Sequence, residues 1–285
     1  MALSNIALSS GMRNNLLAMQ GTANLMNTTS ERLGTGKKVN SALDNASAYF
    51  ASQSHMQRAN DLDARKDGMS EAIQTIKAAD AGIEGITTMV EQIKGLVNDS
   101  VGASTEVQTA NQASIQELVE QINAMVSDSG YKGTNLLLDG DTEGTGVPEG
   151  KLTVYFNESG DSYLEVIGKD LGALGLGLGD TSDASVATTI DVLTDTSQAL
   201  TDINDALNSL RSASTQLSAN LGVITARQEF TSNMMNTLQI GADNLTLADL
   251  NEEGANMLAL QTQQQLSTSA LSLASQASQS VLRLF

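Results

Sequence analysis

The chain has 285 residues with four Tyr, four Phe, no Trp and a single Pro, although compact cores rely on aromatic bulk and the loops of globular domains usually carry several prolines. It has no cysteine and one histidine, which excludes disulfides, thiolate nucleophiles, cysteine-bound metals and two-histidine metal sites. Its 15 basic and 33 acidic residues give a net charge of −18, which disfavours nucleic acid as a partner because phosphate binding needs a basic face.

The sequence gives no sign of membrane insertion. No segment approaches the ~18 consecutive apolar residues of a membrane helix. The first residues lack both the basic start and the apolar block of a secretory signal. We therefore expect no membrane partner. If the protein leaves the cell, we expect it to use a route that does not need a signal peptide.

The first predicted helix carries a seven-residue repeat. Apolar or small side chains recur at alternating intervals of four and three residues, at Met12, Leu16, Met19, Ala23, Met26, Ser30 and Leu33. This is the spacing of a coiled-coil seam. One interpretation of this seam is that two amphipathic helices pack together in one core. We favour association between separate molecules, because terminal segments with so little charge are otherwise hard to explain.

Two apolar stripes predict further helices. One runs from Met69 to Val97 at intervals of three and four residues with no proline, and a shorter one runs from Ile115 to Met125 after a Gly/Ser/Thr break at 102–105. His55 lies in a helical stretch without a second metal ligand. We expect this histidine to be solvated or half-buried.

The middle of the chain differs from the ends. Residues 139–144 have the acidic spacing of the start of a calcium loop, but Gly150 stands where a bidentate Glu is needed, so we favour an acidic surface loop. Residues 151–156 and 162–167 are β-branched and aromatic and flank a turn, which predicts a β-hairpin. The glycine-rich run 172–179 lacks a phosphate-binding pattern and is predicted to be a flexible loop.

The second half returns to heptads. Apolar positions from Leu200 to Leu238 keep the repeat, and a helix over 185–238 would be ~80 Å long. A last seam follows at Leu266, Ala270, Leu273, Ala277, Val281 and Leu284. The predicted fold class is mainly α: an elongated antiparallel helical bundle or coiled coil with one small β-hairpin. No catalytic constellation is found, so we expect no enzyme, no cofactor and no metal.

Three long motifs resemble bacterial flagellins, particularly those of the alphaproteobacterial, Caulobacter type. The first is Arg32-Leu-Gly-Thr-Gly-Lys-Lys-Val-Asn-Ser-Ala-Leu-Asp-Asn-Ala46, after the first helix. The second is Gly130-Tyr-Lys-Gly-Thr-Asn-Leu-Leu137. The third is the tail, from Gly241-Ala-Asp-Asn-Leu-Thr-Leu-Ala-Asp-Leu-Asn-Glu-Glu-Gly-Ala-Asn-Met257 to Ser280-Val-Leu-Arg-Leu-Phe285. The resemblance covers roughly residues 1–138 and 198–285.

The resemblance implies a domain plan. Residues 1–33 and 247–285 would be the terminal coiled-coil helices of the D0 layer, and 34–46 and 239–246 the spokes. Residues 47–238 would be the D1 bundle, with helices near 47–100, 104–129 and 185–238 and the hairpin at about 151–167. Only about 180–184 remains where outer domains are normally inserted, so D2 and D3 would be missing.

The resemblance also implies function and partners. The chain would be a secreted, extracellular structural subunit that self-assembles into the flagellar filament for motility. Its partners would be other copies of itself, the type III export apparatus, a secretion chaperone, and the cap and hook-junction proteins. The predicted assembly interface is Met12, Leu16, Met19, Ala23, Met26, Leu33, Leu266, Ala270, Leu273, Ala277, Val281 and Leu284.

Three other classes of protein share some of these features. A hook-filament junction protein has flagellin-like termini but usually a larger middle. A flagellin with an inserted metallopeptidase would need an HExxH motif, which is absent. A coiled-coil rod or receptor stalk would not carry the family motifs.

Overall fold

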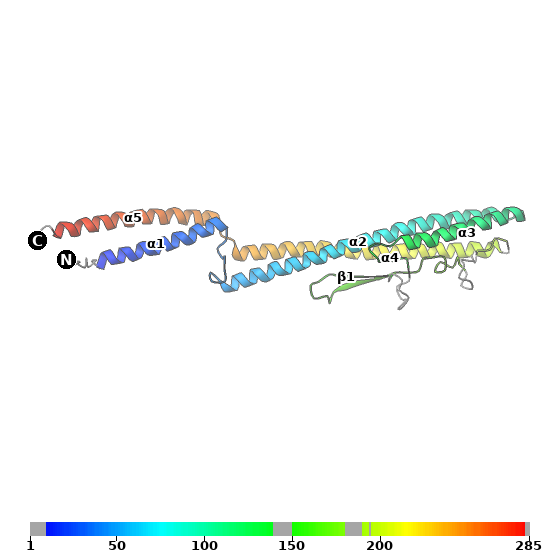
Figure 1. The fold of residues 1–285 in the computed structure, drawn as a ribbon, viewed down its shortest axis with the longest axis horizontal. Helices are drawn as coiled ribbons and strands as arrows, with labels where there is room; N and C mark the ends of the chain where they lie inside the picture. Colours follow the sequence, from blue (N-terminus) through cyan, green and yellow to red (C-terminus); the bar gives the residue numbers. More distant parts are fainter. Residues whose placement is uncertain (1–9, 139–149, 180–189, 194, 283–285) are drawn as a thin grey trace. The chain divides into compact units, whose positions relative to one another are not determined.

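A computed structural model describes residues 10–138, 150–179, 190–193 and 195–282 of the chain (Figure 1). The chain divides into two compact units, one made of residues 1–57 and 237–285 and the other of residues 58–236. The expected acidic loop at 139–144 and the short segment at 180–184 lie outside the described residues.

The first unit is built on two terminal helices, α1 (Ser10–Thr35) and α5 (Leu250–Leu282), which pack side by side (Figure 1). Their pairing is antiparallel, because the end of α1 meets the start of α5. There Arg32 forms an ion pair with Glu253 at 2.9 Å, and Lys37 forms a β-bridge with Leu247. Neither helix contains proline, so the hydrogen-bond ladder of each can run uninterrupted.

The segment after α1 is fixed to the segment before α5. The Lys38 and Val39 amides both donate to the Thr246 carbonyl, at 2.7 and 3.3 Å, and the Ala248 amide donates to the Gly36 carbonyl at 3.0 Å. Gly36 has a φ of 70°, a left-handed conformation that glycine adopts without steric cost after a helix. The two connections of this unit therefore form one hydrogen-bonded turn region.

The second unit is an antiparallel helical bundle formed by α2 (Ala46–Ser100) from residue 58 on, α3 (Thr105–Asp128), and α4 (Thr196–Thr246) up to residue 236. Hydrogen bonds join α2 and α4 in opposite order, from Lys94–Asn204 through Asp80–Ser214 to Ser70–Gln228. The turn at 101–104 reverses the chain between α2 and α3. The fully buried side chains of this bundle include Met69, Ile76, Ile86, Ile93, Ile115, Ile122, Ile203 and Leu210.

The hairpin packs onto this core. Strands β1 (Lys151–Tyr155) and β2 (Tyr163–Ile167) pair antiparallel, with Leu152 opposite Val166 and Val154 opposite Leu164. Val154 and Val166 are buried while Tyr155 and Tyr163 are exposed, as expected of a strand pair with one covered face. The predicted hairpin is confirmed, and so is the mainly helical fold class with a small two-stranded sheet.

Two predictions about local structure were wrong. The helix expected over 185–238 begins only at Thr196 and continues to Thr246. Residues 190–193 form a non-helical segment in which Ile190 and Val192 are buried. Their apolar side chains pack into the core from a loop, and the apolar spacing could not distinguish this from a turn of helix.

The glycine-rich run 172–179 is also not a free loop. It folds into tight turns in which the Leu176 amide donates to the Gly172 carbonyl at 2.9 Å and the Leu178 amide to the Ala173 carbonyl at 2.8 Å. Leu176 and Leu178 are buried in the core. A Cβ at Gly175 would collide with the backbone of Asp170. Gly175 is therefore needed for close backbone approach, and Leu176 and Leu178 anchor the segment.

Candidate assembly surface

The contact between α1 and α5 is a heptad seam. On α1 a row of half-buried or buried positions runs through Met12, Asn15, Met19, Thr22, Met26, Thr29 and Leu33, and Ala23 and Arg32 are half-buried beside it. On α5 the corresponding row runs through Glu253, Met257, Leu260, Gln264, Ser267, Leu271 and Ala274, and Ser275 is half-buried beside it. Both sets alternate intervals of three and four residues, which is the pattern of an antiparallel coiled coil. The seam is thus partly polar, and most of its side chains are only half-buried.

The structure divides the predicted interface residues of α1. Met12, Met19, Ala23, Met26 and Leu33 are half-buried in the paired helices, whereas Leu16 is exposed. The seam uses the polar row 15, 22 and 29, and of the positions 16, 23 and 30 that the repeat alone predicts, only Ala23 is half-buried. Thr22 is accommodated because its hydroxyl donates to the Ala18 carbonyl one turn earlier, at 2.9 Å.

The predicted residues of α5 lie on the other side of that helix. Leu266, Ala270, Leu273 and Ala277 are all exposed in the single chain. Leu284 and the side chain of Val281 lie outside what the structure describes. The seam residues of α5 were not found from the sequence. They could have been found from a second heptad row in the α5 sequence, which starts at Glu253 and includes Met257, Leu260 and Leu271.

Seven leucines stand exposed on the described parts of the paired helices. One of them is Leu250 at the first position of α5, and we call the other six the outer leucines. They are Leu16, Leu17 and Leu25 on α1 and Leu258, Leu266 and Leu273 on α5, with exposed fractions of 42–67%. No charged side chain lies between Arg13 and Glu31, or between Glu253 and Arg283. An apolar surface of this kind without charge is characteristic of a region that another macromolecule covers.

The Arg32–Glu253 pair closes one end of the seam. Arg32 Nη1 donates to Glu253 Oε1 at 2.9 Å, and the Glu253 side chain is 9% exposed while that of Arg32 is 39% exposed. A nearly buried carboxylate needs such a partner, because an unpaired charge in that position is strongly destabilising. The pair therefore fixes which turn of α1 lies beside the start of α5.

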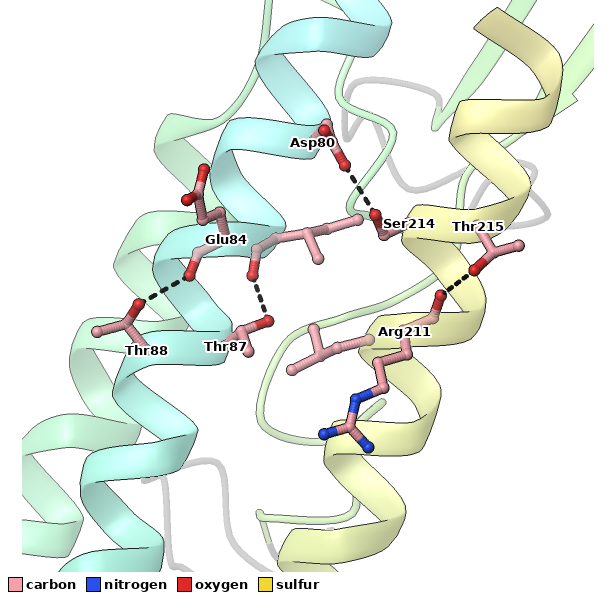
Figure 2. A pocket seen from close by; sticks show the side chains of 9 residues that line it. Asp80, Glu84, Thr87, Thr88, Arg211, Ser214 and Thr215 are labelled. Atoms are coloured by element: carbon pink, nitrogen blue, oxygen red, sulfur yellow. Dashed lines mark hydrogen bonds between the residues drawn. The ribbon is translucent and has the colours of Figure 1, made fainter. Parts of the chain in front are cut away.

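A groove of about 560 Å³ lies between α2 and α4 in the second unit (Figure 2). Several of its polar side chains take part in hydrogen bonds. Ser214 donates to the Asp80 carboxylate at 2.9 Å, and the hydroxyls of Thr87 and Thr88 donate to carbonyls one turn earlier in α2. The Ser214–Asp80 hydrogen bond joins α4 to α2 across this groove.

The described residues offer neither a metal site nor a membrane span. Among them, no group of three or more His, Cys, Asp or Glu side chains is placed to hold a metal ion. The helices with described residues contain no stretch long and apolar enough to cross a bilayer. His55 is half-buried on α2 in the first unit, near Gly241 of α4.

Comparison with known proteins identifies the family. The family model of the bacterial flagellin N-terminal helical region matches residues 4–142, and that of the C-terminal helical region matches residues 200–285. Flagellin FljO of Caulobacter vibrioides is 31% identical over 288 residues that cover all of both chains. A flagellin of Brucella melitensis is 30% identical over 99% of each chain.

A solved structure is also similar. The crystal structure of Bacillus cereus flagellin matches with a TM-score of 0.48 and 11% identity, over 57% of this chain and 88% of that chain. The two family models together cover most of the chain, and the curated relatives align along its whole length. The chain therefore belongs to the bacterial flagellins, the family of flagellar filament subunits.

Proposed function

We propose that this flagellin polymerises through the paired helices α1 and α5, with the outer leucines as the contacts between subunits. The observation that carries the proposal is the set of six leucines left exposed on helices that have no charged side chain over most of their length. Covering one half-exposed leucine stabilises an interface by about 1 kcal/mol. Six such contacts per subunit, repeated along a polymer, supply a substantial driving force.

The predicted interface is refined by this geometry. The exposed residues Leu16, Leu266, Ala270, Leu273 and Ala277 act between subunits. The half-buried residues Met12, Met19, Ala23, Met26 and Leu33 act within the subunit, where they pair α1 with α5. A contact that joins different surfaces of identical subunits leads to an open helical polymer rather than a closed ring when the rotation does not close.

The domain plan belongs to the same proposal. Residues 1–33 and 247–285 act as the D0 helices, 34–46 and 239–246 as spokes, and 47–238 as D1. In support, the compact unit of both termini, at 1–57 and 237–285, is separate from the unit at 58–236 that holds the hairpin. The α4 helix runs without a break through the second spoke to Thr246, so that spoke is helical.

The finer assignments follow from the family. The subunit is exported by the flagellar type III apparatus with a secretion chaperone, is added beneath the filament cap, and functions outside the cell. Relatives whose names describe them as flagellins align over the entire chain. This favours a filament subunit over a hook-junction protein.

The test is polymerisation of point variants, followed by electron microscopy and by the concentration of subunit that remains soluble at equilibrium. L266Q/L273Q removes two outer leucines and is expected to raise that concentration at least tenfold, because a loss of about 1.4 kcal/mol is already a factor of ten. Deletion of residues 254–285 is expected to abolish filaments.

The matched control is L174Q, because Leu174 is 56% exposed but lies in the loop of the second unit. It is expected to polymerise as the unaltered chain does. Circular dichroism of the soluble subunits should be the same for all point variants, since every altered side chain is exposed. Normal filaments from L266Q/L273Q would overturn the proposed contact. A failure of the unaltered chain to form filaments would favour a junction protein instead.

A further inference from the structure

A cavity of about 230 Å³ lies in the second unit, between α2, α4 and the turn that joins β1 to β2. Four large apolar side chains line it: Leu62, Phe156, Phe230 and Met234. Leu62 and Phe156 are buried, whereas Phe230 is 55% exposed. Because pockets for drug-sized ligands have volumes of about 300–1,000 Å³, this cavity fits a smaller molecule, with on the order of ten non-hydrogen atoms. We call it the hairpin pocket.

Two arginines line the hairpin pocket, but only one of them has an acidic partner. Arg58 Nε forms an ion pair with Glu158 Oε1 at 2.9 Å. Arg227 forms no ion pair with any residue that the structure describes, although the chain has 33 acidic and 15 basic residues. Its guanidinium lies over the Phe156 ring, 5.3 Å from the ring centre. The ring covers one face of the guanidinium and leaves the N–H groups at its edge available to an anion.

A buried hydroxyl also lines the pocket. Thr231 is only 2% exposed, yet its hydroxyl makes no hydrogen bond within the described ranges of the chain. The hydroxyls of Thr75 and Thr246, which are buried too, each donate to a carbonyl one turn earlier in their helix. A buried polar group without a hydrogen bond is rare because it is destabilising. An acceptor atom of a ligand in the pocket satisfies the Thr231 hydroxyl.

We propose that the hairpin pocket binds a small monocarboxylate that carries an aromatic ring. The carboxylate accepts hydrogen bonds from the Arg227 guanidinium and the Thr231 hydroxyl, and the ring packs against the apolar lining. An arginine fork matches the two oxygens of a carboxylate, and rings pack favourably on the two phenylalanines. A single negative charge suits the pocket, because one arginine is already neutralised by Glu158. The site lies wholly in the second unit, so it goes beyond the proposed function and does not depend on it.

The Arg58–Glu158 pair adjusts the charge of the pocket. Both side chains are partly exposed, 54% and 34%, so their effect on a bound anion is moderate. Glu158→Gln removes a negative charge and frees Arg58, and it is expected to tighten binding by about threefold. Arg58→Gln leaves the charge of Glu158 unbalanced and is expected to weaken binding by about the same factor. These opposite effects distinguish recognition of an anion from simple filling of an apolar cavity.

The experiment titrates the full, unpolymerised chain with 3-phenylpropionate and follows its backbone amides by NMR. We expect a dissociation constant of about 1 mM or below, which is reasonable for a ligand of this size. The amide shifts should change around residues 156–162 and 227–234. Two matched compounds separate the contributions of ring and charge. These are 3-phenyl-1-propanol, which lacks the charge, and propionate, which lacks the ring, and each is expected to bind about tenfold more weakly or less.

Substitutions then test the two polar groups. Arg227→Gln is expected to weaken binding by about tenfold or more, and Thr231→Val, which keeps the side-chain shape, by about threefold. The control is Arg211→Gln, because Arg211 is an exposed arginine of the same helix that does not line the pocket. It is expected to bind as the unaltered chain does. Thermal unfolding checks the fold of each variant, and Thr231→Val still decides the proposal if Arg227→Gln fails to fold.

Equal binding of the three compounds, or unchanged affinity in Thr231→Val, would overturn the proposal. Light scattering of the same solutions tests another occupant. If no compound binds, and soluble subunits associate with one another in a way that Arg227→Gln abolishes, the pocket accepts an acidic side chain of a second copy and the proposal is wrong. Polymerisation of L266Q/L273Q tests the proposed function separately, so the failure of one does not imply the failure of the other.

Discussion

At the scale of single residues, two glycines of α2 lie close to side chains of α3 and of the segment that follows it. A Cβ at Gly82 would lie 2.7 Å from Leu137 Cδ1 and would also collide with Ser129 Oγ. A Cβ at Gly85 would meet only the thioether of Met125, a flexible side chain that can move. Gly82 is therefore the position where a missing side chain matters most for the packing of the bundle.

We expect Gly82→Ala to destabilise the protein by about 1–3 kcal/mol, the usual cost of overpacking a dense core. Gly95 lies in the same helix, and a Cβ added there would have no neighbour within 4 Å. Gly95→Ala is therefore expected to stabilise by about 0.5–1 kcal/mol through helix propensity. Urea unfolding of both variants measures the difference. If the two substitutions shifted the urea midpoint of unfolding equally and in the same direction, a Cβ at Gly82 would not be crowded by its neighbours.

Asp44 organises the turn before α2. Its carboxylate accepts hydrogen bonds from the amides of Ser41 and Asn40 at 2.9 and 3.0 Å. These backbone bonds, first from Ser41 and then from Asn40, hold the pKa of Asp44 below its usual value. Because the folded pKa is depressed, the stabilisation is present above the unfolded pKa and is lost as the pH falls through the folded one. At neutral pH it is fully present.

We therefore expect Asp44→Ala, at pH 7, to speed hydrogen exchange at the Ser41 and Asn40 amides. Asp44→Asn retains an acceptor oxygen without the charge and should give an intermediate rate. The exchange of amides in the α3 helix serves as an internal reference, since α3 belongs to the second unit. Unchanged exchange at residues 40 and 41 in the alanine variant would show that the turn does not depend on this carboxylate.

At the scale of elements, the sequence predicted the bundle well where apolar spacing and burial coincide. The stripe from Met69 to Val97 predicted a helix, and its members Met69, Ile76, Ile86 and Ile93 are fully buried in α2. Such a long periodic segment leaves few alternatives. The hairpin was predictable for a similar reason, because β-branched and aromatic strands flank a short polar turn.

The seam of the terminal helices could be predicted only in part. Met12, Met19, Met26 and Leu33 are members of either possible row, but the intervening positions could be 15, 22 and 29 or 16, 23 and 30. The apolar pattern favours the second row, since it contains Leu16 and Ala23. The folded pair uses the first, in which Thr22 satisfies its own hydroxyl. Apolar content alone cannot reveal that choice when the outer face is also apolar.

The late start of α4 has a physical cause in α3. Gln112 donates from Nε2 to the Ile190 carbonyl at 2.7 Å and accepts at Oε1 from the Val192 amide at 3.0 Å. This pair of bonds replaces the backbone bonds that a helix would supply to the 190–192 segment. Asp195 then accepts from the Ser197 and Gln198 amides, both at 3.0 Å, and starts α4 as its N-terminal cap.

We expect Gln112→Ala to destabilise the second unit by about 1–3 kcal/mol, because it leaves the Ile190 carbonyl and Val192 amide without this partner. Gln116 is exposed in the same helix, and Gln116→Ala should change the free energy of unfolding by less than about 0.5 kcal/mol. Thermal or urea unfolding distinguishes the two. Similar stabilities for both variants would argue that the amide of Gln112 does not hold the 190–192 segment.

At the scale of the whole molecule, two opposing forces act on assembly. The net charge of −18 makes every pair of subunits repel, while the outer leucines favour contact. Repulsion between exposed charges is screened over about 10 Å at 0.1 M ionic strength and over shorter distances at higher salt. The apolar contribution responds to a different property of the salt, since sulfate strengthens the burial of apolar surface by its exclusion from the protein.

These dependences can be separated by comparing sodium sulfate with sodium chloride at equal ionic strength. If charge repulsion alone limits assembly, the soluble subunit concentration should fall equally in both salts. We expect a lower concentration in sulfate, because the outer leucines are buried in the polymer. L266Q/L273Q removes part of that apolar area, so the soluble subunit concentrations in sulfate and in chloride should differ less for this variant than for the unaltered chain. Both salts should still promote its assembly. Equal behaviour of sulfate and chloride for the unaltered chain would place the driving force elsewhere than on the outer leucines.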